Sequence, residues 1–213
     1  MSAVEPWIEK IRLLVVTDPE WIGSRSWPEV VRSVLRGGAR AIQLRHKGAT
    51  ARELFDLGRA LRAVTRDFDA LFFVNDRTDV ALACGADGVH LGPSDLPVSR
   101  ARAYVPRDFL IGASADTVET ACAAERDGAD YLGVGSIFDT TTKSEVAGER
   151  IGVERVREVA GAVRIPVIGI GGVTAENAAS VIAAGARGIA VVRAVLSESD
   201  PEAAVRALVA RLR

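Results

Sequence analysis

A short motif that occurs four times is the feature that most constrains the fold of this chain. Each copy reads Gly-Ala-x and runs on into apolar residues, and the copies begin at Gly38, Gly85, Gly128 and Gly185. A glycine in such a position typically ends a helix, because it adopts the left-handed backbone that many helix ends require. The apolar run that follows is short, as expected of a strand buried on both faces. The motif therefore predicts four steps from a helix into a buried strand.

Four further apolar runs lie between these copies and bring the expected number of strands to eight. They cover residues 13–16, 71–74, 109–112 and 167–170. Helical patterns follow most of the strands, at residues 28–35, 50–66, 116–126, 152–160 and 174–184, and a last helix opens at Asp200-Pro201. Thr50 and Glu53 have the spacing of a capping box, which indicates where one of these helices begins.

Strands that alternate with helices across short connections form a parallel sheet. Eight such units in 213 residues predict a closed (β/α)8 barrel, or TIM barrel, at the small end of the range for this fold. We expect one domain over residues 1–213, because no linker or low-complexity stretch divides the chain. An open doubly wound sheet is the structural alternative, but it usually has fewer strands and would not give this regular doubling.

Composition and charge exclude several classes of function. The net charge is −1 and aromatic residues make up 5% of the chain, which argues against a nucleic-acid-binding surface. No apolar stretch approaches the length of a membrane span, and the first residues lack the pattern of a signal peptide. Cys84 and Cys122 have no metal-binding spacing and suit reduced thiols. We therefore expect a cytoplasmic protein that binds neither nucleic acid nor membrane.

Polar residues concentrate where each predicted strand ends, and in this fold the active site lies at the carboxyl ends of the strands. In chain order they are Thr17 and Asp18, Gln43, Arg45 and Lys47, Asn75 and Asp76, Asp95, Ser114, Thr140, Thr141, Thr142 and Lys143, Gly171 and Gly172, and Arg193. Strand alternation directs Gln43, Arg45 and Lys47 to one side. Two cations and an amide at this spacing favour an anion site over a solvated strand end.

Two acidic residues in this set, Asp76 and Asp95, lie 19 positions apart. A lone aspartate is more often a turn or cap residue, and Asp95 has the position to cap a short helix near residue 96. A helix over residues 78–84 would, however, make the two aspartates the ends of neighbouring strands. Two carboxylates without histidine or cysteine suit Mg²⁺, which completes its shell with water and phosphate oxygens. The pair therefore predicts one shared magnesium site.

A second anion site is predicted after the seventh strand. Glycine at positions 169, 171 and 172, followed by Thr174, resembles a phosphate cradle, in which backbone N–H groups and a helix N-terminus meet the anion. This is also the usual phosphate position in the fold. His90 is expected to be a packing residue inside its strand, and His46 to point away from the site. The residues thus predict a diphosphate site with Mg²⁺, Arg45 and Lys47, together with Lys143, and a separate monophosphate site.

The motifs on which these predictions rest resemble those of the thiamine-phosphate synthase family, in order and over nearly the whole chain. The matching segments are VTD at residues 16–18, QLRHK at 43–47, VNDR at 74–77, GADGVHLG at 85–92 with Asp95, GVGSIF at 133–138 with Thr140, Thr142 and Lys143, and GIGGV at 169–173. The resemblance implies a (β/α)8 fold. It also implies that a hydroxymethylpyrimidine diphosphate is coupled to a thiazole phosphate, with loss of diphosphate after the pyrimidine C–O bond breaks.

The resemblance also implies roles for individual residues. Asp76 and Asp95 match the Mg²⁺ ligands of the family. The pyrimidine diphosphate site corresponds to Gln43, Leu44, Arg45, His46, Lys47, Asn75, Ser114 and Lys143, of which Arg45, Lys47, Ser114 and Lys143 would be catalytic. The thiazole phosphate site corresponds to Thr140, Thr141, Thr142, Gly172, Val192 and Arg193. The expected partners are these two small molecules, and barrels of this kind often form homo-oligomers.

Three positions depart from the family pattern, and two alternative functions remain open. His46 stands where the family usually has glutamate, Asp139 where proline is common, and Arg193 where a serine commonly contacts the phosphate. A thiazole tautomerase of the same fold is an isomerase, which uses a histidine after the fifth strand, whereas residues 113–116 here read ASAD. A non-catalytic barrel that binds thiamine precursors and regulates a partner is the second alternative, and loss of a catalytic group would favour it.

Overall fold

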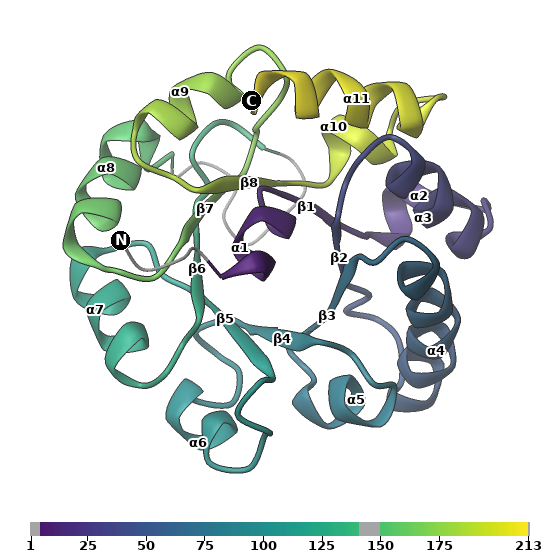
Figure 1. The fold of residues 1–213 in the computed structure, drawn as a ribbon, viewed down its shortest axis with the longest axis horizontal. Helices are drawn as coiled ribbons and strands as arrows, with labels where there is room; N and C mark the ends of the chain where they lie inside the picture. The colour runs from purple at the N-terminus through teal and green to yellow at the C-terminus, as the bar shows by residue number, and fades with distance from the viewer. Residues whose placement is uncertain (1–4, 141–149, 213) are drawn as a thin grey trace.

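Eight parallel strands close into a barrel in the computed structural model, which describes residues 5–140 and 150–212. Each strand pairs with the next along the chain, and β8 pairs back with β1, as Figure 1 shows from one end of the barrel. The strands are β1 (Leu13–Val16), β2 (Ala41–Leu44), β3 (Leu71–Asn75), β4 (Gly88–Leu91), β5 (Leu110–Ser114), β6 (Tyr131–Val134), β7 (Val167–Ile170) and β8 (Gly188–Val191). The predicted (β/α)8 barrel is therefore confirmed, and the open sheet is not formed.

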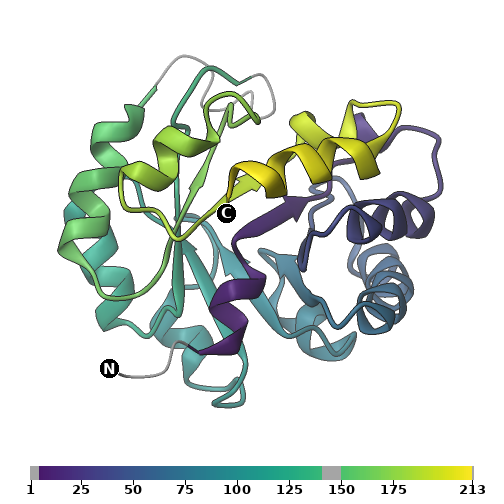
Figure 2. The same ribbon diagram turned by 45° about the horizontal axis from the view of Figure 1, so that its top comes forward.

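Helices surround the barrel (Figures 1 and 2). They are α3 (Trp27–Arg36), α4 (Ala51–Asp67), α5 (Thr78–Ala83), α6 (Val98–Arg102), α7 (Val118–Arg126), α8 (Gly152–Ala162), α9 (Ala178–Ala183) and α11 (Pro201–Arg211), with three short helices α1 (Pro6–Lys10), α2 (Pro19–Ile22) and α10 (Arg193–Leu196). The capping box predicted before α4 is confirmed, because Thr50 and Glu53 bond to each other's backbone N–H groups. None of the helices within the described ranges is long and apolar enough to cross a membrane.

The repeated Gly-Ala motif does what its sequence predicts. Gly38, Gly85, Gly128 and Gly185 all have positive φ angles, between 68° and 111°. Each lies between the end of one helix and the start of the next strand, so the chain reverses without the penalty that a side chain would bring to this backbone. The motif therefore sets four of the turns at the amino end of the barrel.

The core has two layers, which strand alternation separates. On β1, Leu13 and Val15 pack outward against the helices, and Leu14 and Val16 pack inside the barrel. Ile11, which directly follows α1, is fully buried in the inner layer, so α1 closes the amino end of the barrel. Burial of each such aliphatic side chain stabilises the fold by about 1.5–3 kcal/mol. Gly112 leaves room for the Tyr131 ring, from which an added Cβ would lie only 2.2 Å away.

Several element bounds differ from the sequence prediction. The helix predicted over residues 174–184 begins at Ala178, because residues before it form turns, and that predicted from residue 116 begins at Val118 after a Thr117 cap. The helices α1, α2 and α10 were not predicted, because helices of four or five residues carry no readable period. These differences fall in the connections, and the strand positions agree within one or two residues except at the end of β2, which stops at Leu44.

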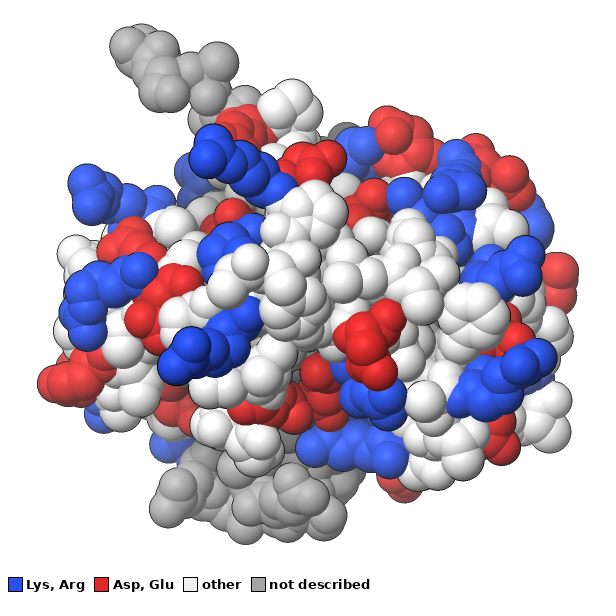
Figure 3. Space-filling view, turned by 90° about the horizontal axis from the view of Figure 1, so that it is seen from below, with Lys and Arg blue, Asp and Glu red and all other residues white. Residues whose placement is uncertain are grey.

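Charged side chains of both signs are interspersed over the face shown in Figure 3. Among the described residues, several charged side chains form ion pairs at the surface, such as Lys10 with Asp69 at 2.7 Å and Arg52 with Asp56 at 2.9 Å. Exposed pairs of this kind contribute little to stability, about 0–1 kcal/mol each.

Candidate functional site

A cavity of about 220 Å³, lined by both charged and apolar residues, lies inside the barrel mouth, and its charged groups come from the carboxyl ends of β2 to β5. Eight residues predicted from the sequence line it: Gln43, Arg45, Lys47, Asn75, Asp76, Asp95, Ser114 and Val192. We call it the first cavity. Arg45 and Lys47 lie beyond the end of β2, which stops at Leu44, so the prediction that the strand carries them is wrong. Their side chains nevertheless reach the space into which Gln43 points.

Asp76 and Asp95 form the acidic side of the first cavity. Asp76 has a φ of 63°, a left-handed conformation that aspartate tolerates better than most residues, and its N–H donates to the His90 carbonyl at 2.9 Å. Burial raises the pKa of Asp76 to about 6, and a hydrogen bond and charge from Asp95 add to this, while Lys47 and Arg45 oppose it. A bound cation would stabilise the charged form of Asp76, which burial and Asp95 disfavour. The Asp95 carboxylate accepts from the Gly92 N–H at 2.7 Å, and α6 begins only after Pro97, so Asp95 does not cap that helix.

The donor set of the first cavity fits a hard cation. Within the described residues there is no cluster of three or more His, Cys, Asp or Glu side chains of the kind that holds zinc. Two carboxylates that share one space, beside basic groups able to hold phosphate, match the ligands that Mg²⁺ takes together with water and phosphate oxygens. Asp76 and Asp95 are therefore the residues that could hold a magnesium ion.

Residues that were not predicted as site residues complete the first cavity. His90 lines it, and its two ring nitrogens lie 3.2 Å from the Tyr131 hydroxyl and 3.1 Å from the Ser114 hydroxyl. Burial raises the pKa of Tyr131, an effect that a hydrogen bond with Gln43 opposes. A polar network thus crosses the barrel interior from Gln43 to Ser114. Alternation could have revealed His90, because Val89 and Leu91 on either side face the outer layer.

Leu44 and His46, which the resemblance assigns to the substrate site, lie with their side chains outside the first cavity. Leu44 is fully buried in the outer layer of the core. The His46 ring stacks on Trp27, with 5.7 Å between centroids and 6° between planes. This placement agrees with the expectation that His46 points away from the ligand, and it leaves only the backbone of these two residues for a substrate contact.

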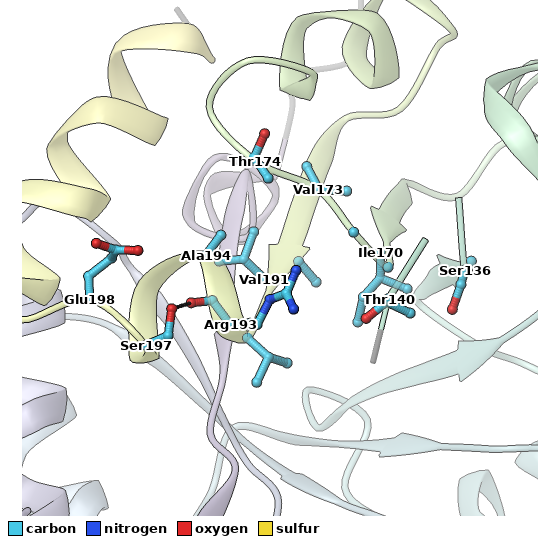
Figure 4. Close-up of a pocket in the computed structure, with 15 residues that line it drawn as sticks. Ser136, Thr140, Ile170, Val173, Thr174, Val191, Arg193, Ala194, Ser197 and Glu198 are labelled. Carbon is cyan, nitrogen blue, oxygen red and sulfur yellow. Dashed lines mark hydrogen bonds between the residues drawn. The ribbon is translucent and has the colours of Figure 1, made fainter. Parts of the chain in front are cut away.

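A second cavity, of about 250 Å³, lies at the carboxyl ends of β6, β7 and β8 (Figure 4). Gly171 and Gly172 form part of its wall, with φ angles of 94° and 66°. An added Cβ would lie 2.5 Å from the Ser136 Cα at Gly171, and 2.5 Å from the Asp139 carbonyl at Gly172. Both positions therefore require glycine for the backbone angle and for the space. Two glycines of the predicted cradle, Gly171 and Gly172, thus line a cavity, whereas Gly169 packs against Val181 and Ile137.

The start of α9 does not form part of this wall in the way predicted. The turn before the helix is closed by Asn177, whose side chain accepts from the Thr174 N–H at 2.8 Å and donates to the Gly172 carbonyl at 3.0 Å. The helix itself has six residues and begins at Ala178. The expectation that a helix starting at Thr174 faces the anion is therefore wrong, and the loop backbone takes that place.

The remaining predicted residues of the second cavity lie on both sides of it. Thr140, Val192 and Arg193 line it, and Figure 4 shows the Arg193 side chain directed to the side where Thr140 lies. The Arg193 guanidinium carbon lies 5.9 Å from the centre of the Trp21 ring, a cation–π contact. Thr141, Thr142 and Lys143 lie outside the described residues.

The two cavities adjoin. Both are lined by the same four residues, Gly135, Ile170, Ala190 and Val192. Three of these carry apolar side chains and the fourth has none, so the part of the boundary that the structure describes offers no charged group. Each cavity has cationic groups in its lining, Arg45 and Lys47 in the first and Arg193 in the second. Such an arrangement suits two anionic ligands whose uncharged parts meet at the apolar boundary.

These features define a (β/α)8-barrel protein whose ligand site lies at the carboxyl ends of its strands, where enzymes of this fold carry out their chemistry. The family model described as thiamine monophosphate synthase matches residues 13–195. The chain therefore belongs to that family, as the resemblance of its motifs indicated.

Individual relatives agree with this assignment. The chain is 53% identical over 196 residues to "Thiamine-phosphate synthase" of Moorella thermoacetica, an alignment that covers 92% of this chain and 93% of the relative. It is 50% identical over 202 residues to the protein of the same name from Pyrococcus abyssi, with 94% of each chain covered. Relatives this similar over nearly their full length show the same family membership as the family model.

Solved structures give the same picture. The thiamine phosphate pyrophosphorylase from Pyrococcus furiosus superimposes with a TM-score of 0.88 at 44% identity, and the match covers 97% of both chains. A 3-hexulose-6-phosphate synthase superimposes with a TM-score of 0.70 at 19% identity, covering 95% of this chain and all of the other. The second likeness shows the fold alone, because the identity is too low to carry a function.

Proposed function

We propose that this chain is a thiamine-phosphate synthase, which joins a hydroxymethylpyrimidine diphosphate to a thiazole phosphate and releases diphosphate. The observation that carries the proposal is the shared boundary of the two cavities, at Gly135, Ile170, Ala190 and Val192. One substrate can enter each cavity with its anionic end outward, so that the reacting ring atoms meet at this boundary. The names of the relatives and the family membership support the same reaction.

The first cavity is the proposed site of the pyrimidine diphosphate. Asp76 and Asp95 would hold Mg²⁺, and a bound Mg²⁺ would neutralise charge that builds on the departing diphosphate. Arg45 and Lys47 line the same cavity and would bind the diphosphate oxygens. Gln43, Asn75 and the network of His90 and Ser114 present hydrogen-bonding groups deeper in the barrel, where they would orient the pyrimidine ring. Lys143 is assigned to the diphosphate by the resemblance.

The second cavity is the proposed site of the thiazole phosphate. The backbone at Gly172 and Val192 and the side chains of Thr140 and Arg193 would hold the phosphate, with Thr141 and Thr142 assigned by the resemblance. The pyrimidine C–O bond breaks and its electron pair leaves with the diphosphate. The thiazole nitrogen then donates its lone pair to the methylene carbon, so one C–N bond forms and no proton is transferred. The apolar boundary excludes water, which would otherwise capture the carbon.

The direct test supplies the pure protein with both precursors, with Mg²⁺ or with excess EDTA, and measures diphosphate and thiamine phosphate. We expect equal amounts of both products with Mg²⁺, and neither with EDTA. Thiazole isomerisation without diphosphate release would identify the tautomerase alternative. Binding of the precursors with no turnover of any kind would identify the regulatory alternative, and either result would overturn the proposal.

The setting proposed for this reaction is the cytoplasm. Cys84 and Cys122 are both free thiols, as expected of a protein in a reducing compartment. The proposed partners are the two phosphorylated substrates, without nucleic acid or membrane, and assembly into a homo-oligomer would be measured by light scattering.

A further inference from the structure

The short helix α2 connects the walls of the two cavities, although none of its residues lines either one. It follows β1 directly, and its ends are held by Asp18 on one side and Arg25 on the other. Neither residue was assigned to substrate in the proposed function. Both bond to groups that belong to the cavity walls, so the contacts at the two ends of α2 determine what this helix can do.

Asp18 makes two bonds with its two carboxylate oxygens. Oδ2 accepts from the Arg45 guanidinium in an ion pair whose side chains are only 14% and 9% exposed for Arg45 and Asp18. Oδ1 accepts from the Glu20 N–H at 3.0 Å, which makes Asp18 the N-cap of α2. An arginine with a long flexible stem gains a fixed direction from a buried carboxylate partner. The same carboxylate therefore orients a group of the first cavity and fixes the start of α2.

The other end of α2 is joined to the second cavity. The Arg25 guanidinium donates to the Leu196 carbonyl, at the end of α10, and to the Glu198 carbonyl at 3.4 Å. It also donates to the carbonyls of Trp21 and Ile22, the latter at 3.1 Å, so one side chain fastens α2 to α10. The Trp21 ring in turn supports the Arg193 guanidinium. Residues 192–194 and 197–198 all line the second cavity.

We propose that Asp18 is a positioning residue that serves both substrates, because it holds Arg45 in the first cavity directly and α10 in the second through α2. The assignment of substrates to the cavities rests on the proposed function. The contacts themselves run without a gap from Arg45 through Asp18, α2 and Arg25 to α10. Loss of both Asp18 bonds is therefore expected to disturb both cavities. Loss of the Arg25 bonds is expected to disturb only the second cavity.

The chemistry of asparagine separates the two bonds of Asp18. Asparagine caps a helix about as well as aspartate does, because its side-chain carbonyl accepts the same N–H bond. It has no charge to pair with a guanidinium, so Asp18→Asn keeps α2 fixed and releases Arg45. Alanine removes both bonds. Asp200 is the N-cap of α11 and accepts from the Ala203 N–H at 3.0 Å, so the same two substitutions there provide a matched control.

Steady-state kinetics with both substrates test the proposal. We expect Asp18→Asn to raise the KM of the pyrimidine diphosphate by about three- to tenfold and to leave that of the thiazole phosphate within about twofold. Asp18→Ala is expected to raise both KM values, and Arg25→Ala only the second. Asp200→Ala is expected to lower thermal stability and Asp200→Asn to leave it nearly unchanged, and neither should change a KM. Equal effects of Asp18→Asn and Asp18→Ala on both KM values would overturn the proposal.

A binding measurement on Asp18→Asn tests the positioning role without turnover. It also does not require that the alanine variant folds. Calorimetry with inorganic diphosphate and Mg²⁺ is expected to show about three- to tenfold weaker binding for Asp18→Asn than for the unchanged protein. Equal affinity in the two proteins would contradict a positioning role for Asp18. Absence of product formation by the unchanged protein would contradict the proposed function instead, so the two failures are distinguishable.

Discussion

The two cavities share one boundary, yet different chemical groups line them: charged side chains in the first and glycine backbone in the second. The first cavity presents charged side chains at the ends of β2, β3 and β4, such as Arg45, Asp76 and Asp95. The second presents backbone, shaped by glycines at positions where a side chain has no room. The first is therefore sensitive to the loss of one charge, and the second to the gain of one methyl group. Substitutions that remove a charge from the first cavity or add a methyl group to the second distinguish the two.

Removal of one charge from the first cavity is expected to have the largest effect. Asp76→Asn keeps the size of the side chain and tolerates the left-handed backbone, but it removes one of the two proposed Mg²⁺ ligands. We expect kcat/KM to fall by about 100-fold or more, measured with saturating Mg²⁺.

The matched control for this substitution is Asp69→Asn. Asp69 also has a left-handed backbone, with φ 50°, but it is exposed and pairs with Lys10 outside both cavities. Unchanged kinetics are expected for this variant. A loss of activity by Asp69→Asn as large as that of Asp76→Asn would show that backbone strain, and not the metal site, explains the effect.

Addition of one methyl group to the second cavity is expected to act next in size. In Gly172→Ala the new Cβ would lie 2.5 Å from a backbone carbonyl, in a residue with φ 66°. We expect the thiazole phosphate KM to rise by about tenfold, because the loop must move, and the melting temperature to fall by several degrees. The pyrimidine diphosphate KM is expected to change little.

Gly85→Ala isolates the effect of the backbone angle. Gly85 has a φ of 68°, but the nearest atom to its added Cβ is an Arg66 nitrogen at ordinary contact distance, 3.6 Å. This variant should lose stability by about 1–2 kcal/mol, measured by denaturant unfolding, and keep both KM values. If Gly85→Ala raised the thiazole phosphate KM as much as Gly172→Ala does, the lack of space at Gly172 would not explain the effect on the second cavity.

Proton competition gives an intermediate effect that is confined to the first cavity. Because burial and Asp95 raise the pKa of Asp76 to about 6, a proton competes with Mg²⁺ at acid pH. We expect the Mg²⁺ affinity to be steady above pH 7 and to fall by up to about tenfold per pH unit below 6. Isothermal calorimetry at a series of pH values checks this, and a flat profile would contradict it.

The raised pKa of Asp76 also affects the stability of the fold, by a smaller amount. Protonation of Asp76, which weakens Mg²⁺ binding, stabilises the folded chain. Its raised pKa means that the folded chain binds a proton more tightly than the unfolded chain, so its contribution is present below pH about 4 and lost as the pH rises through about 6. Without Mg²⁺, Asp76→Asn is therefore expected to melt a few degrees above the unchanged protein at pH 7.5. At pH 4 the two melting curves should coincide, and a lower melting temperature at pH 7.5 would contradict this account.

The smallest effect is expected at His46, which the resemblance assigns to the substrate site. Its ring stacks on Trp27 outside the first cavity. The variant His46→Phe retains an aromatic partner for Trp27, so both KM values should stay within about twofold of the original. A larger rise in the pyrimidine diphosphate KM alone would show that the imidazole reaches the ligand during turnover.

The strands were predictable because each carries its own local signal. The Gly-Ala motif marks four of them, and short apolar runs mark the others. β2 shows the limit: QLRHK alternates as a strand should, but pairing stops at Leu44, so Arg45 and Lys47 lie in the following turn. The start of α9 was misplaced for a related reason, because the Asn177 side chain closes a turn that the helical pattern does not reveal.

Asp76, Asp95 and the loop at Gly171 and Gly172 were predictable because all carboxyl ends of the strands meet at one end of a (β/α)8 barrel. Asp18 and His90 were harder to assign, because their roles depend on residues far away in the sequence. The partner of Asp18 is Arg45, and His90 bonds to Tyr131 and Ser114. A sequence pattern shows which face of a strand a residue occupies, but contacts across a barrel depend on the packing of every strand between.

The central claim is that two cavities with one boundary form a single site, with one metal on the acidic side of the first. The most direct measurement is a crystal structure of the product complex with Mn²⁺ in place of Mg²⁺, located by its anomalous scattering. We predict one Mn²⁺ bound to carboxylate oxygens of both Asp76 and Asp95, in contact with diphosphate. The organic product should cross the boundary at Ile170. A metal bound elsewhere, or a product confined to one cavity, would contradict the account.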